Sequence, residues 1–143
     1  MNDVIARLVS AGMLQSVPAD VASAKRWLED AERHLKAAAQ IADVDRSGSY
    51  ALLYDASRKA IAAILLAAGF RVMAAPGAHA ALAEAATSLT TVEDELSYLR
   101  QIDRMRRQRN RSEYGVRSFS TAELGRAAEV ARWIVDFANA RVT

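Results

Sequence analysis

Apolar residues recur every three or four positions along most of the chain, which is the spacing of one helix face. The clearest stripe predicts a helix from Ala19 to about Val44, with charged side chains on its opposite face. A second predicted helix, from Tyr50 to Ala68, is apolar almost all round, as is typical of a helix at the centre of a bundle. The segment 46–49 (Arg-Ser-Gly-Ser) is predicted to separate these two helices, and Gly69 to cap the second one.

Two capping-box patterns, in which Thr or Ser is followed three residues later by Glu, predict the starts of two more long helices. They begin at Thr90 with Glu93 and at Ser120 with Glu123. No segment has the pattern of a strand pair. The fold class predicted for residues 1–143 is therefore a single all-α domain, an up-and-down helical bundle of four main helices plus two short helices. The remaining predicted helices cover residues 3–14, 78–88, 90–114 and 120–140.

The composition narrows the possible chemistry. The absence of cysteine excludes disulfides, thiolate zinc sites and a thiol nucleophile, and with two histidines we expect no metal site. No glycine-rich phosphate loop is present, so no cofactor is expected. The longest apolar run, 60–70, is too short for a bilayer span of about 20 residues, and the first residues are not a basic signal start. We therefore expect a cytoplasmic protein without membrane contact.

Positive charge is concentrated in one segment. The whole chain has a net charge of +2, whereas seven arginines against two acidic residues give segment 100–117 a net charge of +5. The rest of the chain is therefore net acidic. The arginines of this segment are Arg100, Arg104, Arg106, Arg107, Arg109, Arg111 and Arg117.

Two interpretations of this segment remain open. A basic run near a helix C-terminus is often a solvated face that complements the helix dipole. Arginine's planar fork, however, also suits bidentate phosphate contacts. The register adds that the buried stripe of Leu99 and Ile102 continues to Arg106 and Arg109. The helix therefore either runs past the core into solvent or lines a polar cleft.

The run from Arg107 to Gly115 resembles the signature region of the HEPN superfamily. These are small helical domains of prokaryotic toxins, nucleotidyltransferase partners and defence systems. Segments 31–38, 50–69 and 77–82 resemble, in order, the first long helix, the second helix and the next short helix of such domains. The similarity extends over about residues 20–138.

The resemblance implies a specific site. Many HEPN domains are metal-independent ribonucleases whose motif is an arginine, a polar residue, three variable positions and a histidine, and two copies form one basic cleft in a homodimer. Arg109 matches the arginine, Asn110 matches the polar residue, and Tyr114 stands at the histidine position. The expected catalytic residues are these three. The expected nucleic-acid contacts are Arg104, Arg106, Arg107 and Arg111.

Tyr114 changes the expected chemistry. Histidine suits proton transfer because its pKa lies near neutrality, whereas tyrosine, with a pKa of about 10, is a poor base at pH 7. The sequence thus keeps the anion-binding half of the site and loses its best proton shuttle. Neither histidine is assigned to the site. His34 is expected to be structural beside its apolar stripe, and His79, at a loop-to-helix junction, is the better candidate of the two.

The leading hypothesis is a HEPN-like homodimer that binds RNA or a nucleotide at an arginine-rich cleft. It would be a weakened or inactive metal-independent ribonuclease of toxin–antitoxin type, with an antitoxin as partner. The alternative is a non-enzymatic interaction module that partners a nucleotidyltransferase or another protein, with Tyr114 as a candidate nucleotide acceptor. A third interpretation is a helical bundle that carries no site.

Overall fold

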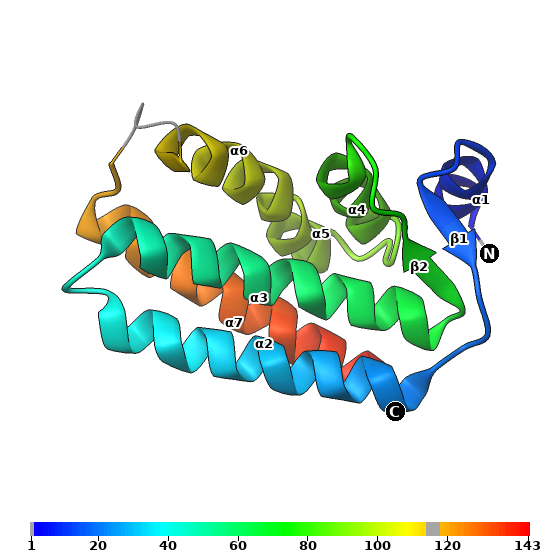
Figure 1. Cartoon of the computed structure of the whole chain (residues 1–143), viewed down its shortest axis with the longest axis horizontal. Coiled ribbons are helices and arrows are strands. Elements are labelled where there is room, and N and C mark those ends of the chain that lie inside the picture. The colour runs from blue at the N-terminus through cyan, green and yellow to red at the C-terminus, as the bar shows by residue number, and fades with distance from the viewer. Residues whose placement is uncertain (1, 114–117) are drawn as a thin grey trace.

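The structure, a computed structural model, describes residues 2–113 and 118–143. Helices dominate it, as predicted, and the all-α class is confirmed (Figure 1). In chain order the elements are α1 (Asp3–Ser10), β1 (Leu14–Ser16), α2 (Val21–Ile41), α3 (Arg46–Ala67), β2 (Phe70–Val72), α4 (Ala78–Thr87), α5 (Glu93–Leu99), α6 (Gln101–Glu113) and α7 (Thr121–Arg141).

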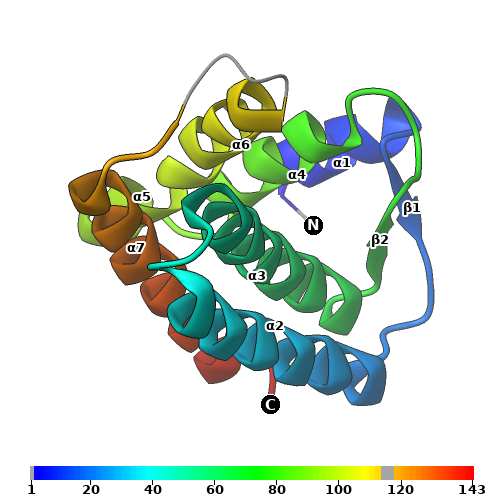
Figure 2. The same cartoon turned by 60° about the vertical axis from the view of Figure 1, so that its left-hand side comes forward.

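Helix α3 is the centre of the bundle. It packs against α2 and α7 on one side and against α4 and α6 on the other, so these four helices surround it (Figure 2). Its buried side chains are distributed over most of its circumference, which confirms the interpretation of its all-round apolar sequence. The central helix therefore contributes side chains both to the α2–α7 side of the molecule and to the α4–α6 side.

The predicted break at 46–49 is wrong, because these residues form the first turn of α3. The Asp45 carboxylate caps this turn by accepting a hydrogen bond from the Gly48 N–H at 2.9 Å. The Ser49 hydroxyl donates to the Ala38 carbonyl of α2 at 2.7 Å. These two bonds satisfy the polar groups of a weak helix-forming segment, so the helix begins four residues before Tyr50.

The predicted helix over 90–114 is divided into α5 and α6 at Arg100. Its predicted capping box is wrong, since the residue at the N-cap is Val92. The Thr90 hydroxyl instead accepts from the Val92 N–H and donates to Glu95.

The second predicted capping box is confirmed. Ser120 accepts from the Glu123 N–H at 3.1 Å, and the Glu123 carboxylate accepts from the Ser120 N–H at 3.2 Å. These bonds fix the start of α7 next to the end of the arginine-rich segment.

The strands are the element that the sequence pattern missed. β1 and β2 form a two-stranded antiparallel sheet in which Leu14 lies opposite Val72. Strands of three residues are too short to show an alternating pattern. The predicted glycine cap is confirmed, since Gly69 follows α3 with φ +95°. Within the described part of the chain, no helix combines the length and the apolarity that a bilayer span requires.

Candidate nucleic-acid interface

Helix α6 places two of its arginines, Arg106 and Arg109, against the bundle. Ile102 and Met105 are buried and anchor the first half of α6 on α3 and α4. One turn further on, Arg106, Arg109 and Asn110 are half-buried. Of the two geometries left open by the register, the structure has a helix that lines a polar surface.

The inner arginines, Arg106 and Arg109, face α3. Arg106 donates two hydrogen bonds to one oxygen of Asp103, at 2.8 and 3.0 Å. The guanidinium carbon of Arg109 lies 5.7 Å from the ring centroid of Tyr54, a cation–π distance. A third arginine, Arg58 of α3, completes the positive charge of this region.

Arg58 is incompletely satisfied. Its Nε lies 3.6 Å from a carboxylate oxygen of Asp55, beyond hydrogen-bond distance. This Nε is buried and has no hydrogen-bond partner among the residues that the structure describes. A buried donor of this kind is costly unless a ligand or water accepts its proton.

A tyrosine–histidine pair lies between these arginines. The hydroxyl of Tyr54, a fully buried residue of α3, is 3.0 Å from Nδ1 of His79 in the first turn of α4. Burial raises the pKa of Tyr54 to about 12, against the opposing effect of Arg58, Arg106 and Arg109. Burial, and next Arg58 and Arg109, lower the pKa of His79 below its ordinary value. The phenol is therefore protonated and the imidazole neutral near pH 7. We call Tyr54, Arg58, His79, Arg106 and Arg109 the inner cluster.

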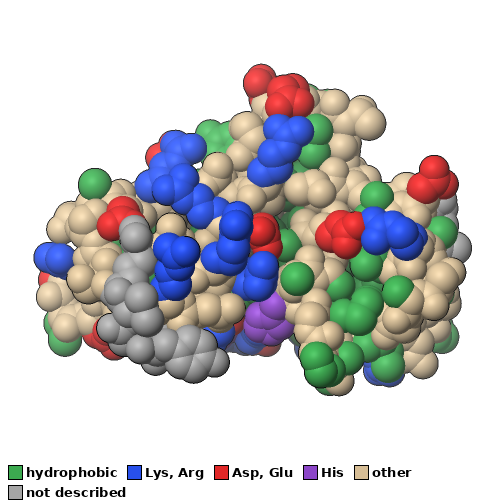
Figure 3. Space-filling model, turned by 90° about the horizontal axis from the view of Figure 1, so that it is seen from above, with side chains coloured by type: hydrophobic (Ala, Val, Ile, Leu, Met, Phe, Trp, Pro, Cys, Tyr) green, Lys and Arg blue, Asp and Glu red, His purple; other side chains and the backbone are tan. Residues whose placement is uncertain are grey.

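The outer arginines, Arg104, Arg107 and Arg111, share another face of α6. With Gln108 they line a hollow of about 310 Å³. Arg107 lies 3.2 Å from Asp103, whereas Arg104 and Arg111 make no ion pair with a described residue. Figure 3 shows basic side chains gathered on this face of the molecule. Positive charge on α6 therefore points both toward the inner cluster and toward solvent.

A comparison with models of protein families shows to which family the chain belongs. The HEPN domain model matches residues 24–141, most of the chain. The chain belongs to the HEPN family. No curated protein and no solved structure matches it. The family assignment confirms the resemblance drawn from the arginine-rich segment, and it supports a nuclease- or toxin-type domain or an interaction module in general.

The structure separates the residues predicted for the HEPN site. Of the predicted catalytic residues, Arg109 belongs to the inner cluster. Of the predicted nucleic-acid contacts, Arg106 belongs to it as well, whereas Arg104, Arg107 and Arg111 are the outer arginines. Asn110 is half-buried on α6. Tyr114 lies outside the described residues, so the predicted grouping of Arg109, Asn110 and Tyr114 stays a prediction.

Sequence reasoning missed most of the inner cluster of this HEPN domain. From the sequence alone, neither Tyr54 nor Arg58 stands out as a site residue. A signal was available, because the charged residues Asp55, Arg58 and Lys59 interrupt the most apolar helix of the chain. His34 lies elsewhere, with Nε2 at 2.8 Å from Lys59 Nζ.

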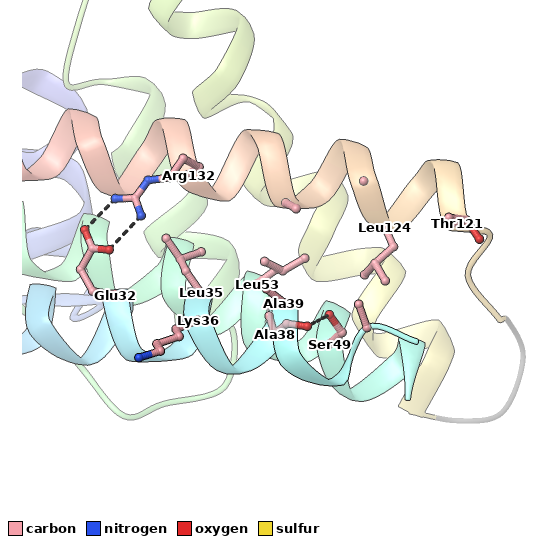
Figure 4. Close-up of a pocket in the computed structure, with 13 residues that line it drawn as sticks. Glu32, Leu35, Lys36, Ala38, Ala39, Ser49, Leu53, Thr121, Leu124 and Arg132 are labelled. Carbon is pink, nitrogen blue, oxygen red and sulfur yellow. Dashed lines mark hydrogen bonds and ion pairs between the residues drawn. The ribbon is translucent and has the colours of Figure 1, made fainter. Parts of the chain in front are cut away.

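A second hollow lies on the side of α2 and α7. These helices diverge over α3 and leave a groove of about 490 Å³ between them (Figure 4). Two hydrogen bonds from Arg132 to Glu32, at 2.6 and 2.8 Å, connect α7 with α2 at one end of the groove. Most of its lining is apolar and small, and no residue of α6 contributes to it. The apolar lining residues are Leu35, Ala38, Ala39, Ala42, Leu53, Leu124, Gly125 and Ala128.

Among the described residues, no group of three or more His, Cys, Asp or Glu side chains is placed to hold a metal ion. The residues of the inner cluster are of types that bind anions through guanidinium groups and transfer protons through a histidine, here the one paired with Tyr54.

Proposed function

We propose that this HEPN domain binds the phosphates of RNA along α6. The observation that carries the proposal is the number of arginines on this helix for which the described residues offer few acidic partners. Arg106 and Arg107 share the single carboxylate of Asp103. Arg104 and Arg111 form no ion pair with a described acidic side chain. Uncompensated guanidinium groups spaced along one helix suit the phosphates of a nucleic-acid strand.

The two arginine faces take different parts in this proposal. The outer arginines hold the strand, and Arg109 with Asn110 holds the phosphate at which reaction would occur. Tyr114 stacks on a base or positions a phosphate. The functional unit is a homodimer in which two copies of α6 flank one basic cleft. We further propose that it acts as a weakened metal-independent ribonuclease of toxin–antitoxin type.

The test is binding of a fluorescently labelled mixed-sequence oligoribonucleotide, followed by anisotropy at about 50 and about 200 mM salt. The informative variant replaces the outer arginines together, Arg104→Gln, Arg107→Gln and Arg111→Gln. Its matched control removes three exposed cations from α2, Lys25→Gln, Arg26→Gln and Arg33→Gln, and therefore changes net charge equally.

Each phosphate contact contributes about 0.7 to the slope of log affinity against log salt for a single strand. Loss of three contacts should lower that slope by about 2. A fourfold increase in salt should therefore reduce the RNA affinity of the variant about 20-fold less than it reduces the affinity of the wild type. The α2 control should bind like the wild type. Equal losses in both variants, or binding that ignores salt, would refute the proposal.

The groove between α2 and α7 favours a second candidate function, that of a protein-interaction module. A partner such as a nucleotidyltransferase would insert an apolar helix between Leu35 and Leu124. Calorimetric titration with a small nucleotidyltransferase tests this candidate. Ala39→Glu with Ala128→Glu, two exposed groove positions, should abolish binding while the outer-arginine variant keeps it. The reverse pattern would assign such a partner to α6.

A further inference from the structure

The inner cluster contains a histidine that the HEPN motif does not. We propose that His79 is the proton-transferring residue of this domain and accepts the proton of a ribose 2′-hydroxyl in an RNA strand held by Arg58 and Arg109. The inference rests on the proposed binding of RNA. It assigns to α4 the role that the histidine position of the motif, here Tyr114, leaves without a good base.

The contact with Tyr54 occupies Nδ1 of the His79 imidazole and leaves Nε2 available to a ligand. Nδ1 of His79 is held by the Tyr54 hydroxyl at 3.0 Å, and Tyr54 is fully buried in the central helix, so the ring is positioned from the rigid part of the fold. We assign to His79 the tautomer in which Nδ1–H donates to the phenol oxygen, so that Nε2 carries the lone pair. Because His79 is exposed, a bound strand can reach that nitrogen.

The charges around His79 come from two neighbouring helices. Arg58 and Asp55 lie on α3, and Arg106 and Arg109 on α6. The positive majority favours the neutral imidazole, which is the form that can accept a proton. A phosphodiester bound between these arginines would offset their charge and make the imidazole more basic. His79 would therefore be unprotonated before RNA binds and better able to hold a proton once it has bound.

The step balances without a metal or a redox partner. The ribose 2′-oxygen attacks the adjacent phosphorus while its proton moves to Nε2 of His79, so a P–O2′ bond forms. The bond from phosphorus to the 5′-oxygen breaks, and that oxygen takes a proton from water. The imidazolium then releases its proton to solvent. The products are a 2′,3′-cyclic phosphate and a 5′-hydroxyl, while Arg58 and Arg109 stabilise the charge on the phosphoryl oxygens.

Cleavage and binding are measured on the full chain with a randomised RNA in EDTA, from about pH 5.5 to about pH 8.5. New 2′,3′-cyclic phosphate ends are quantified by mass spectrometry. His79→Gln should lower cleavage by about 100-fold or more, with RNA affinity within about twofold of the wild type. The matched control is His34→Gln, which removes the other histidine and should cleave normally. Tyr54→Phe should displace the pH profile, because it removes the bond that orients Nδ1.

Histidine NMR gives a readout that does not depend on turnover. The chain has two histidines, so His34→Gln assigns both ring signals. Addition of a 2′-O-methyl oligoribonucleotide, which cannot be cleaved, should raise the pKa of His79 and leave that of His34 unchanged. Three results would overturn this inference alone if RNA binding still depends on salt. They are the absence of cyclic phosphate ends, full cleavage activity of His79→Gln, and a His79 pKa that does not change when the oligoribonucleotide binds. Absence of salt-dependent binding would overturn the proposed function as well.

Discussion

Two glycines lie within long helices in opposite surroundings, and this difference yields a quantitative prediction. A β-carbon added to Gly125 of α7 would meet nothing within 4 Å. The φ of Gly125 is not positive, so alanine fits its backbone. Glycine costs about 1 kcal/mol relative to alanine inside a helix. Gly125→Ala should therefore raise the free energy of unfolding by about 1 kcal/mol.

Gly48, in the first turn of α3, carries an opposing cost. An added β-carbon would lie 2.3 Å from Oδ2 of Asp45, whose other oxygen caps the helix through the Gly48 N–H. The carboxylate must turn away, and loss of such a cap costs about 1 kcal/mol. This cost offsets the gain in helix propensity. Gly48→Ala should thus leave the free energy of unfolding unchanged or lower it slightly, about 1 kcal/mol below Gly125→Ala.

Urea unfolding followed by far-UV circular dichroism measures both variants, and thermal unfolding should separate them by about 2–4 °C for a chain of this size. An equal gain in both variants would show that Asp45 caps α3 from another rotamer, which would refute the steric argument. No gain from Gly125→Ala would contradict the open surroundings of that position.

Two further predictions concern how the stability of the fold depends on pH. Hydrogen bonds from Arg132 lower the pKa of Glu32, so the pair stabilises the fold above the ordinary carboxyl value of 4.5 and this contribution is lost as pH falls. Because both side chains are nearly half exposed, Glu32→Gln should cost only about 0.5 kcal/mol at pH 7, measured by urea unfolding, and nothing at low pH. Burial lowers the pKa of His34 and of His79 below 6.5, so the unfolded chain binds more protons and stability should fall as pH drops below that value. His34→Gln should make the decline shallower in the same assay, and an unchanged pH profile would contradict this assignment.

The long helices were predictable because periodicity over about 20 residues leaves little ambiguity. Their ends were not, since each start depends on what one side chain does. Asp45 makes 46–49 the first turn of a helix by capping it, although the same residues are typical of a loop. Thr90 fits the capping-box pattern but its hydroxyl binds Glu95 instead. Such choices between neighbouring acceptors are settled by tertiary position, which a local pattern does not contain.

The charge of the candidate site was predictable from the sequence, whereas the residues that surround its arginines were not. The excess of arginine in 100–117 identified α6 directly. The division into inner and outer arginines depends on how α6 is rotated against α3 and α4, and only packing sets that rotation. Tyr54 and His79 are 25 residues apart and meet through the turn that brings α4 back over α3. A contact of this kind has no signature in either segment alone.

The inner arginines bear on the choice between an interface and a simple bundle. A helix that only had to close the core would place apolar side chains at positions 106 and 109, because half-burying a guanidinium costs free energy unless its charge is compensated. Among the described residues, this compensation is incomplete for Arg106 and for Arg58 of α3. Asp103 serves both Arg106 and Arg107, and Arg58 Nε is buried without a hydrogen bond. An anion between α3, α4 and α6 would supply the missing hydrogen-bond acceptors. The guanidinium groups that destabilise the free bundle would therefore stabilise its complex with a phosphate.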